Sequence, residues 1–278
     1  AGKVVSLKIR SKPRGKGDQN EQTVHLAKKD DGWVVADRDE YPADKDKVQK
    51  LLDQLLELKI GIALASNPAN HNQLKVGERE YDRAVTLGTA KQAKTIIVGS
   101  APSSSVNLRY QGENDVFRAP GMSVWSINDS VSGYLETKYV EVDKEKLSQA
   151  VVSNPQGRLS FAKEGDKWAL AELPPGETLD ETKVKSFINK LIKLNLREPV
   201  GREQKAEYGL AEGAEVFLVS TGEEGTVTTR YVIGGFRDDQ SLYAKADDND
   251  WVVLVAKWSA EDIREKAATD FAKKKKNK

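Results

Sequence analysis

The sequence predicts an α+β protein made of two tandem repeats, each a mostly antiparallel sheet packed by an amphipathic helix with a closing C-terminal helix. Three observations support this prediction. Similar residues recur at a nearly constant spacing, a hairpin pattern begins each copy, and an apolar helical stripe follows each hairpin. The predicted repeats span residues 1–138 and 139–278, and the second carries a basic C-terminal tail.

The internal repeat consists of matches in almost constant register. Trp33 aligns with Trp168 at a shift of 135 residues, and residues 44–58 align with 180–194 after one inserted residue. Further pairs at the shift of 135 are Val98 with Ile233, Gly99 with Gly234, Asn114 with Asn249, and Asp115 with Asp250. Agreement over so many positions indicates an internal duplication.

Each repeat begins with a predicted β-hairpin. Residues 24–28 and 159–163 form short strands, and the polar turns KDDG and EGDK lead from them into WVVA and WALA. Polar turn residues between two apolar strands are typical of hairpins. Because Trp33 and Trp168 begin the second strand of each pair, we expect both indole rings to pack in the core.

A helix is predicted after each hairpin. Asp44 and Asp180 follow proline-bearing loops and are placed to cap the helix N-terminus. Apolar residues then recur on one face, which we expect to lie on the sheet and to contribute about 1.5–3 kcal/mol per large side chain. The two stripes are Val48, Leu51, Leu52, Leu55, Leu56 and Leu58, and Val184, Phe187, Ile188, Leu191, Ile192 and Leu194.

The rest of each repeat is predicted as strands and a closing helix. Alternating segments end in glycine at TIIVGS and RYVIGG, and short strands follow around VNLRY and DVFRA, matched by SLYAKA and WVVLVA. The closing helices are expected over 123–136 and 258–274, with Trp125 and Trp258 seating them. The polar segment 11–22 is predicted to be a mobile loop between two strands.

Composition excludes several classes of function. The 44 basic and 43 acidic residues nearly cancel, so no strong field attracts nucleic acid or an anionic membrane. The absence of cysteine excludes disulfides, thiolate nucleophiles and cysteine-based zinc sites. No run of 18 apolar residues is present. A tag scar, a cleaved signal or a removed membrane anchor would each explain a chain that begins at Ala1.

Several motifs resemble the bacterial DUF4340 family over nearly the whole chain. They are the repeated Trp-led strand, YPAD at 41–44, the K-V-x-x-(L/F)-(L/I) helix and EYGL at 207–210. The first half departs from the pattern, with LKVGEREYDRAVTL where YGL is expected. The family has no established activity. The resemblance implies an envelope protein with one N-terminal membrane helix and an extracytoplasmic repeat region, often beside gliding-associated ABC transporters.

Polar clusters are interpreted as structural rather than chemical. The two histidines, His25 and His71, have no further aligned ligands for zinc. The acidic clusters at 30–32, 37–46, 237–240 and 247–250 lack the full EF-hand spacing, and Asp and Asn at 247–250 suit a hairpin turn. A weak metal site remains the alternative there.

Catalytic and cofactor motifs are missing. The serine-rich segment 100–107 lacks a nucleophile elbow, and no phosphate-binding glycine loop is present. We therefore predict no catalytic, cofactor-binding or metal-binding residue and no cofactor. Lys273–Lys278 form a basic tail, for which a solvated helix end competes with contact to anionic lipid or nucleic acid.

The leading functional hypothesis is a non-catalytic binding or scaffolding module. We expect it to be periplasmic or extracytoplasmic, membrane-anchored in the full-length protein, and bound to protein partners in the envelope, such as an ABC-transporter-type assembly of the gliding-associated kind. No nucleic acid or small-molecule substrate is predicted. The alternative is a hydrolase or carbohydrate-active enzyme with two carboxylates, which requires an acidic pair lining a concavity.

Overall fold

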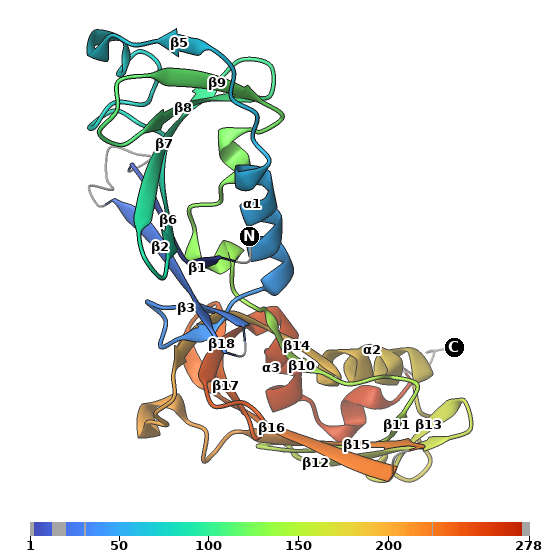
Figure 1. Ribbon diagram of the computed structural model, residues 1–278. Coiled ribbons are helices and arrows are strands. Elements are labelled where there is room, and N and C mark those ends of the chain that lie inside the picture. The colour runs from blue at the N-terminus through green and yellow to red at the C-terminus, as the bar shows by residue number, and fades with distance from the viewer. Residues whose placement is uncertain (1–2, 13–20, 31, 224, 274–278) are drawn as a thin grey trace. The chain divides into compact units, whose positions relative to one another are not determined.

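The protein is mostly β. The computed structural model describes residues 3–12, 21–30, 32–223 and 225–273. Strands make up 48% of the residues and helices 18%, so the predicted α+β class of helix-packed repeats is wrong. Two large antiparallel sheets dominate, and three α-helices lie within the described residues (Figure 1). The two helical stripes are the clearest patterns in the sequence, but strands occupy far more of the chain than helices do.

The chain divides into two compact units, unit 1 over Ala1–Glu136 and unit 2 over Thr137–Lys278. This boundary lies two residues before the one predicted from the sequence, between 138 and 139. The described residues of each unit form one nine-stranded sheet.

Within the described residues, unit 1 contains nine strands and one α-helix. In chain order these are β1 Val4–Ser11, β2 Gln22–Lys29, β3 Gly32–Val35, β4 Tyr41–Pro42, α1 Lys45–Leu56, β5 Ala63–Ala65, β6 Arg83–Thr89, β7 Ala93–Ala101, β8 Ser105–Tyr110 and β9 Val116–Pro120. Three short 3₁₀ helices add η1 Pro68–Asn70, η2 Val124–Ser126 and η3 Val131–Gly133. From edge to edge the sheet runs β4-β3-β2-β1-β6-β7-β8-β9-β5.

In the part of unit 2 that the structure describes there are nine strands and two α-helices. They are β10 Lys138–Glu141, β11 Leu147–Asn154, β12 Gly157–Glu164, β13 Lys167–Leu170, α2 Glu181–Leu191, β14 Lys193–Gly201, β15 Ala214–Gly222, β16 Gly225–Asp238, β17 Ser241–Ala246, β18 Val252–Ala256 and α3 Lys257–Glu265. The 3₁₀ helices are η4 Ala206–Tyr208 and η5 Ala268–Phe271. From edge to edge the sheet runs β13-β12-β11-β15-β16-β17-β18-β14-β10.

The strand orders of the two sheets match. Eight strands of unit 1, in the order β3-β2-β1-β6-β7-β8-β9-β5, correspond to β13-β12-β11-β15-β16-β17-β18-β14. The sheets differ at their edges, because β4 extends only the first sheet and β10 extends only the second. Register agrees as well: Ala65 pairs with Val116 and Gly201 pairs with Val252, positions that differ by 136 residues in both strands.

The predicted hairpins and helix caps are confirmed. Lys28 pairs with Trp33 and Lys163 with Trp168, and both tryptophans are only 8% exposed. The side chain of Asp44 accepts hydrogen bonds from the backbone at the start of α1, and Asp180 does the same for α2. The stripes are buried at Val48, Leu51, Leu52 and Leu55, and at Val184, Phe187, Ile188 and Leu191.

The glycines in TIIVGS and RYVIGG do not end their strands. They lie inside β7 and β16, where a loop carbonyl crosses the strand. A Cβ atom on Gly99 would lie 2.4 Å from the Leu74 carbonyl oxygen, and one on Gly234 would lie 2.3 Å from that of Tyr208. Only glycine permits this approach. The next loop residue is left-handed in both units, Lys75 with φ 58° and Gly209 with φ 59°. Leu74-Lys75 of the first half therefore takes the place of Tyr208-Gly209.

The closing helix predicted over 123–136 is absent. This segment instead forms η2 and η3, two single turns. Asn128 Oδ1 accepts from the Ser130 N–H at 2.9 Å, and such short polar side chains compete with helical hydrogen bonds. In unit 2 the predicted helix is present as α3 and then breaks into η5. Both segments are anchored alike, since Asp44 N donates to Tyr134 O and Asp180 N to Phe271 O.

Two predictions fall largely outside the described residues. They concern the loop at 11–22, of which 13–20 are not described, and the tail Lys273–Lys278, of which 274–278 are not described. No helix within the described ranges is long and apolar enough to cross a membrane.

Candidate functional site

A pocket lies in unit 2, between α2 and the segment formed by α3 and η5. It has a volume of about 450 Å³. We call it the α2–α3 groove, and its lining residues are Thr182, Lys183, Ser186, Phe187, Asp262, Lys266, Asp270 and Phe271. Phe187 and Phe271 form an aromatic base with their ring centroids 5.0 Å apart, and a third ring, Phe161, packs against both. The groove therefore has an apolar base and a charged rim.

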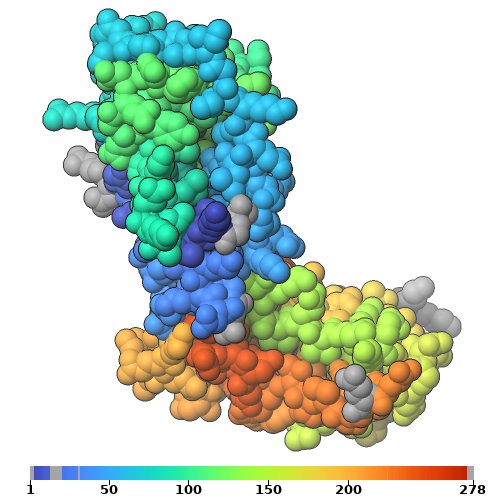
Figure 2. All heavy atoms as spheres, in the orientation of Figure 1, coloured from blue at the N-terminus to red at the C-terminus, as the bar shows by residue number. Residues whose placement is uncertain are grey.

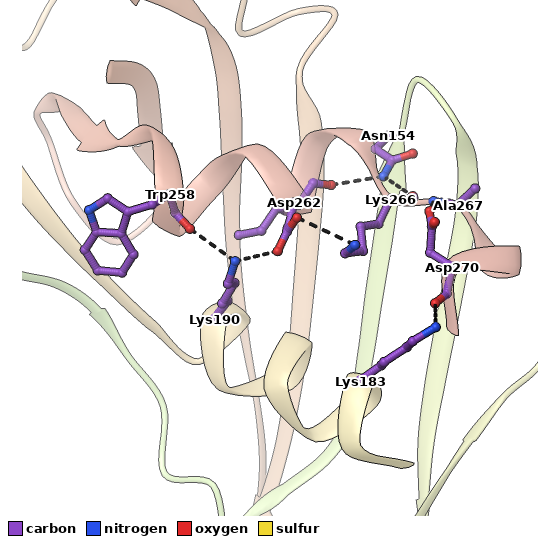
Figure 3. Close-up of polar contacts among 9 residues, drawn as sticks. Asn154, Lys183, Lys190, Trp258, Asp262, Lys266, Ala267 and Asp270 are labelled. Carbon is purple, nitrogen blue, oxygen red and sulfur yellow. Dashed lines mark hydrogen bonds and ion pairs between the residues drawn. The ribbon is translucent and has the colours of Figure 1, made fainter. Parts of the chain in front are cut away.

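Lysines from α2 cross to the closing segment along this rim (Figure 3). The ammonium group of Lys183 donates to the carbonyl oxygens of Asp270 and Ala272, both at 2.9 Å. Lys190 donates to the Trp258 carbonyl at 3.1 Å and pairs with Asp262. These bonds reach the first turn of α3 and the region of η5, and they fasten both to α2.

The two carboxylates of the groove already have protein partners. Asp262 lies between Lys190 and Lys266, and its Oδ1 is 3.7 Å from the Lys266 ammonium nitrogen. Asp270 Oδ2 accepts a hydrogen bond from the Ala267 N–H at 2.9 Å. Both acids line the groove and are already engaged, Asp262 by two lysines and Asp270 by the N–H before η5, as Figure 3 shows.

A smaller pocket occupies the corresponding place in unit 1. Its volume is about 260 Å³, and it is lined by Lys47, Lys50, Leu51, Gln54, Ser126, Asn128, Gly133 and Tyr134. Lys47 aligns with Lys183, but its ammonium group pairs with the helix cap Asp44 at 2.9 Å. Burial raises the pKa of the Tyr134 hydroxyl, which donates to the Asn128 carbonyl at 3.0 Å.

Buried arginines in unit 1 were not identified from the sequence. Arg83 on β6 pairs with Asp129 at 3.1 Å, with only 5% and 7% of the two side chains exposed, and it also donates to the Ile127 carbonyl. Arg109 on β8 donates to the Val76 carbonyl at 2.7 Å. The sequence feature that could have identified them is an arginine at a position of an apolar strand that points into the protein. These side chains hold loops on the sheet.

The histidines lie apart and have ordinary structural partners. His25 is on β2, 3.8 Å from the Asp37 carboxylate, whereas the buried His71 bonds through Nε2 to the Asn114 carbonyl at 2.9 Å. Among the described residues, no three His, Cys, Asp or Glu side chains gather in a way that could hold a metal ion.

The acidic clusters serve turns and caps. Asp238 accepts from the Gln240 N–H at 2.8 Å, and this bond together with one from Ser241 lowers the pKa of its carboxyl group. Asn249 accepts from the Trp251 N–H at 3.1 Å, and Asp247 pairs with Arg230 at 2.7 Å. The hairpin-turn interpretation of 247–250 agrees with these contacts.

The serine-rich segment 100–107 is also a turn. It joins β7 to β8, with Ser103 and Ser104 in left-handed conformations at φ 59° and 48°. The hydroxyl of Ser105 donates to the Pro102 carbonyl, so it bonds within the turn.

The tryptophan prediction was correct for two residues and wrong for two. Trp33 and Trp168 are buried, but Trp125 and Trp258 are 70% and 77% exposed and do not seat closing helices. Trp251 is half-buried, and the guanidinium of Arg202 lies 4.4 Å from its ring centroid.

Exposed apolar side chains are concentrated from the last residue of α1 to β5. Leu56, Ile60, Ile62 and Leu64 are 49%, 45%, 95% and 46% exposed. We call residues 56–64 the exposed apolar segment, and Figure 2 shows this part of the chain in light blue on the surface of unit 1. Large apolar side chains gathered on a surface are a feature of interaction sites.

Comparison with known proteins identifies the family. The family described as a domain of unknown function, DUF4340, matches residues 33–213, which is more than half of the chain. No curated protein and no solved structure matches the chain. The match confirms the resemblance carried by YPAD, the helix motif and EYGL. The chain therefore belongs to the DUF4340 family.

Proposed function

We propose that this protein is a non-catalytic binding or scaffolding module of the cell envelope. Its full-length form is anchored in the membrane with these residues on the extracytoplasmic side, and it serves an ABC-transporter-type assembly of the gliding-associated kind. The chain's membership of the DUF4340 family supports the proposed location, because the resemblance to that family implies an envelope protein with one N-terminal membrane helix.

The two units, in this proposal, are copies of one ancestral unit. The matching order of eight strands supports a duplication, as do the helix caps Asp44 and Asp180. Gly99 and Gly234, each closely approached by a loop carbonyl, support it too. A duplicated β scaffold supplies rigid sheets with different edges, which suits a protein that holds partners.

The exposed apolar segment is the observation that carries the binding function. Ile62 is 95% exposed, and Leu56, Ile60 and Leu64 lie close to it in the chain. Leaving such side chains in water costs roughly 25 cal/mol per Å² of apolar surface, and a partner that covers them recovers this energy.

Co-purification of the full-length, membrane-anchored protein tests the proposal. We expect transporter subunits to be recovered with the wild type and lost with the double variant Ile60→Glu and Ile62→Glu. Val227→Glu is the matched control, because Val227 is 64% exposed but lies on β16 in unit 2. A protein that is recovered alone, or subunits retained by the double variant, would contradict the proposal.

The second candidate is a carboxylate-dependent hydrolase. Asp262 and Asp270 favour it, because both line the α2–α3 groove, whose volume of about 450 Å³ suits a small ligand. Their bonds to lysines and to a backbone N–H favour a structural role instead. Release of sugars from envelope glycans by the wild type, lost with Asp262→Asn while folding is retained, would establish the hydrolase and overturn the binding module.

A further inference from the structure

The two sheets differ at one equivalent edge. In unit 2, β14 pairs with β18 on one side and with β10 on the other. In unit 1, the corresponding strand β5 pairs with β9 and forms the edge of the sheet, at the top of unit 1 in Figure 1. Within the described residues, no strand of unit 1 takes the place of β10.

The conformation of the chain differs between the units at this place. Residues 193–196 form the first part of β14 and pair with β10 through Val140 opposite Leu194 and Glu141 opposite Lys193. The aligned residues 57–60, at the same shift of 136, belong to no strand, and β5 begins only at Ala63.

Burial differs there as well. Leu194 and Leu196 are 0% and 4% exposed beside β10. Their counterparts are Leu58, which is half-buried, and Ile60, which is 45% exposed. The same apolar alternation is therefore buried in unit 2, where an antiparallel strand pairs beside it, and more exposed in unit 1, where no described strand does.

Charge specifies the strand that fits. In unit 2, β10 places Glu141 opposite Lys193 and Lys138 opposite Asn195. The corresponding residues of unit 1 are Glu57 and Lys59, so the charge at the first position is reversed. An incoming strand would need a basic residue opposite Glu57 and an acidic residue opposite Lys59, because opposite charges stabilise cross-strand pairs.

We propose that residues 57–62 accept an antiparallel strand from a partner protein, which extends the sheet of unit 1 as β10 extends that of unit 2. The strand carries an acidic residue, two apolar residues and a basic residue in that order. Backbone hydrogen bonds provide affinity and the side-chain pattern provides specificity, as in other cases of strand addition. This inference rests on the proposed binding function and names the chemistry of the partner.

Peptides of residues 137–142 test the proposal on the full chain. The probe carries Lys138→Glu and Glu141→Lys, and the comparison peptide keeps the natural sequence. At millimolar peptide, we expect amide chemical shifts and hydrogen-exchange protection to change at residues 57–62. The probe should bind about two- to tenfold more tightly than the natural sequence, a difference set by two cross-strand charge pairs.

Matched controls make the result specific. Adding Tyr139→Pro and Val140→Pro to the probe removes two strand N–H donors and should abolish binding. The protein variant Glu57→Lys with Lys59→Glu changes two exposed side chains and should reverse the peptide preference. Unchanged amides at 57–62, equal affinity for both charge patterns, or dimerisation of the chain through this edge would each overturn the proposal.

The outcome is separable from that of the proposed function. If no peptide binds but transporter subunits still co-purify through Ile60 and Ile62, the binding module stands and strand addition is wrong. If the probe binds as expected but no envelope partner is recovered, the edge accepts a strand and the proposed assembly is wrong.

Discussion

Replacing Gly99 by alanine tests the close approach of a loop to β7. The added Cβ atom would lie 2.4 Å from the Leu74 carbonyl oxygen and 2.5 Å from that of Lys75. Both distances are much shorter than an ordinary van der Waals contact of 3.4–4 Å. Both neighbours are backbone atoms, and Lys75 is held in the left-handed region, so neither moves as a flexible side chain would. We expect unit 1 to lose about 1–3 kcal/mol of stability, the usual cost of overpacking.

Gly235→Ala is the matched control for the same assay. Its Cβ atom would lie no closer than 3.6 Å to another atom, so stability should stay within about 1 kcal/mol of wild type. Gly234→Ala, whose Cβ atom would lie 2.3 Å from the Tyr208 carbonyl, should destabilise unit 2 as Gly99→Ala destabilises unit 1. Urea unfolding, monitored by hydrogen exchange in peptides from each unit, measures the stability of unit 1 and of unit 2 separately. A Gly99→Ala protein as stable as Gly235→Ala would refute the reasoning.

Three further predictions concern caps, ion pairs and tyrosines. Asp44→Ala should cost about 1 kcal/mol in urea unfolding and Asp44→Asn much less. Burial raises the pKa of Asp44, but hydrogen bonds from Lys47 and the backbone outweigh it and lower the pKa overall. The advantage of wild type over Asp44→Asn should therefore be complete above the ordinary carboxyl pKa and vanish as pH falls through the lowered folded value. Asp129→Ala should lower the free energy of unfolding by about 3–5 kcal/mol, because it leaves the buried Arg83 charge without the Asp129 carboxylate. The double variant Arg83→Met with Asp129→Leu removes both charges and should cost less. Equal costs for the two variants would contradict this reasoning. Burial raises the pKa of Tyr231, so at high pH the folded state keeps a proton that the unfolded state loses. Stability measured by urea unfolding should therefore fall as pH rises above about 10. Tyr231→Phe should make stability fall less steeply with pH.

Local patterns were sufficient for the start of each unit. The polar turns before Trp33 and Trp168 predicted hairpins, and Asp44 and Asp180 predicted the helix starts, because caps and turns depend on neighbouring residues. The fold class was wrong because the long strands β15 and β16 and the edge strands do not show a distinct period in the sequence.

The candidate sites were less predictable than the elements. The α2–α3 groove brings Lys183 of α2 to Asp270 of η5, residues 87 positions apart, and Arg83 meets Asp129 across 46 positions. Such pairs depend on topology. Trp125 and Trp258 are of a residue type expected in the core, yet their side chains are 70% and 77% exposed.

The sequence by itself determined the two hairpins, the capped helices and membership of the DUF4340 family, since each depends on residues close together in the chain or on a recurring motif. Only the tertiary structure decided which apolar residues are covered. Leu58 and Ile60 repeat the pattern of Leu194 and Leu196, but β10 lies beside the second pair and no described strand lies beside the first. Burial at a sheet edge depends on the elements that lie beside and over the edge, and the sequence of the edge does not contain those neighbours.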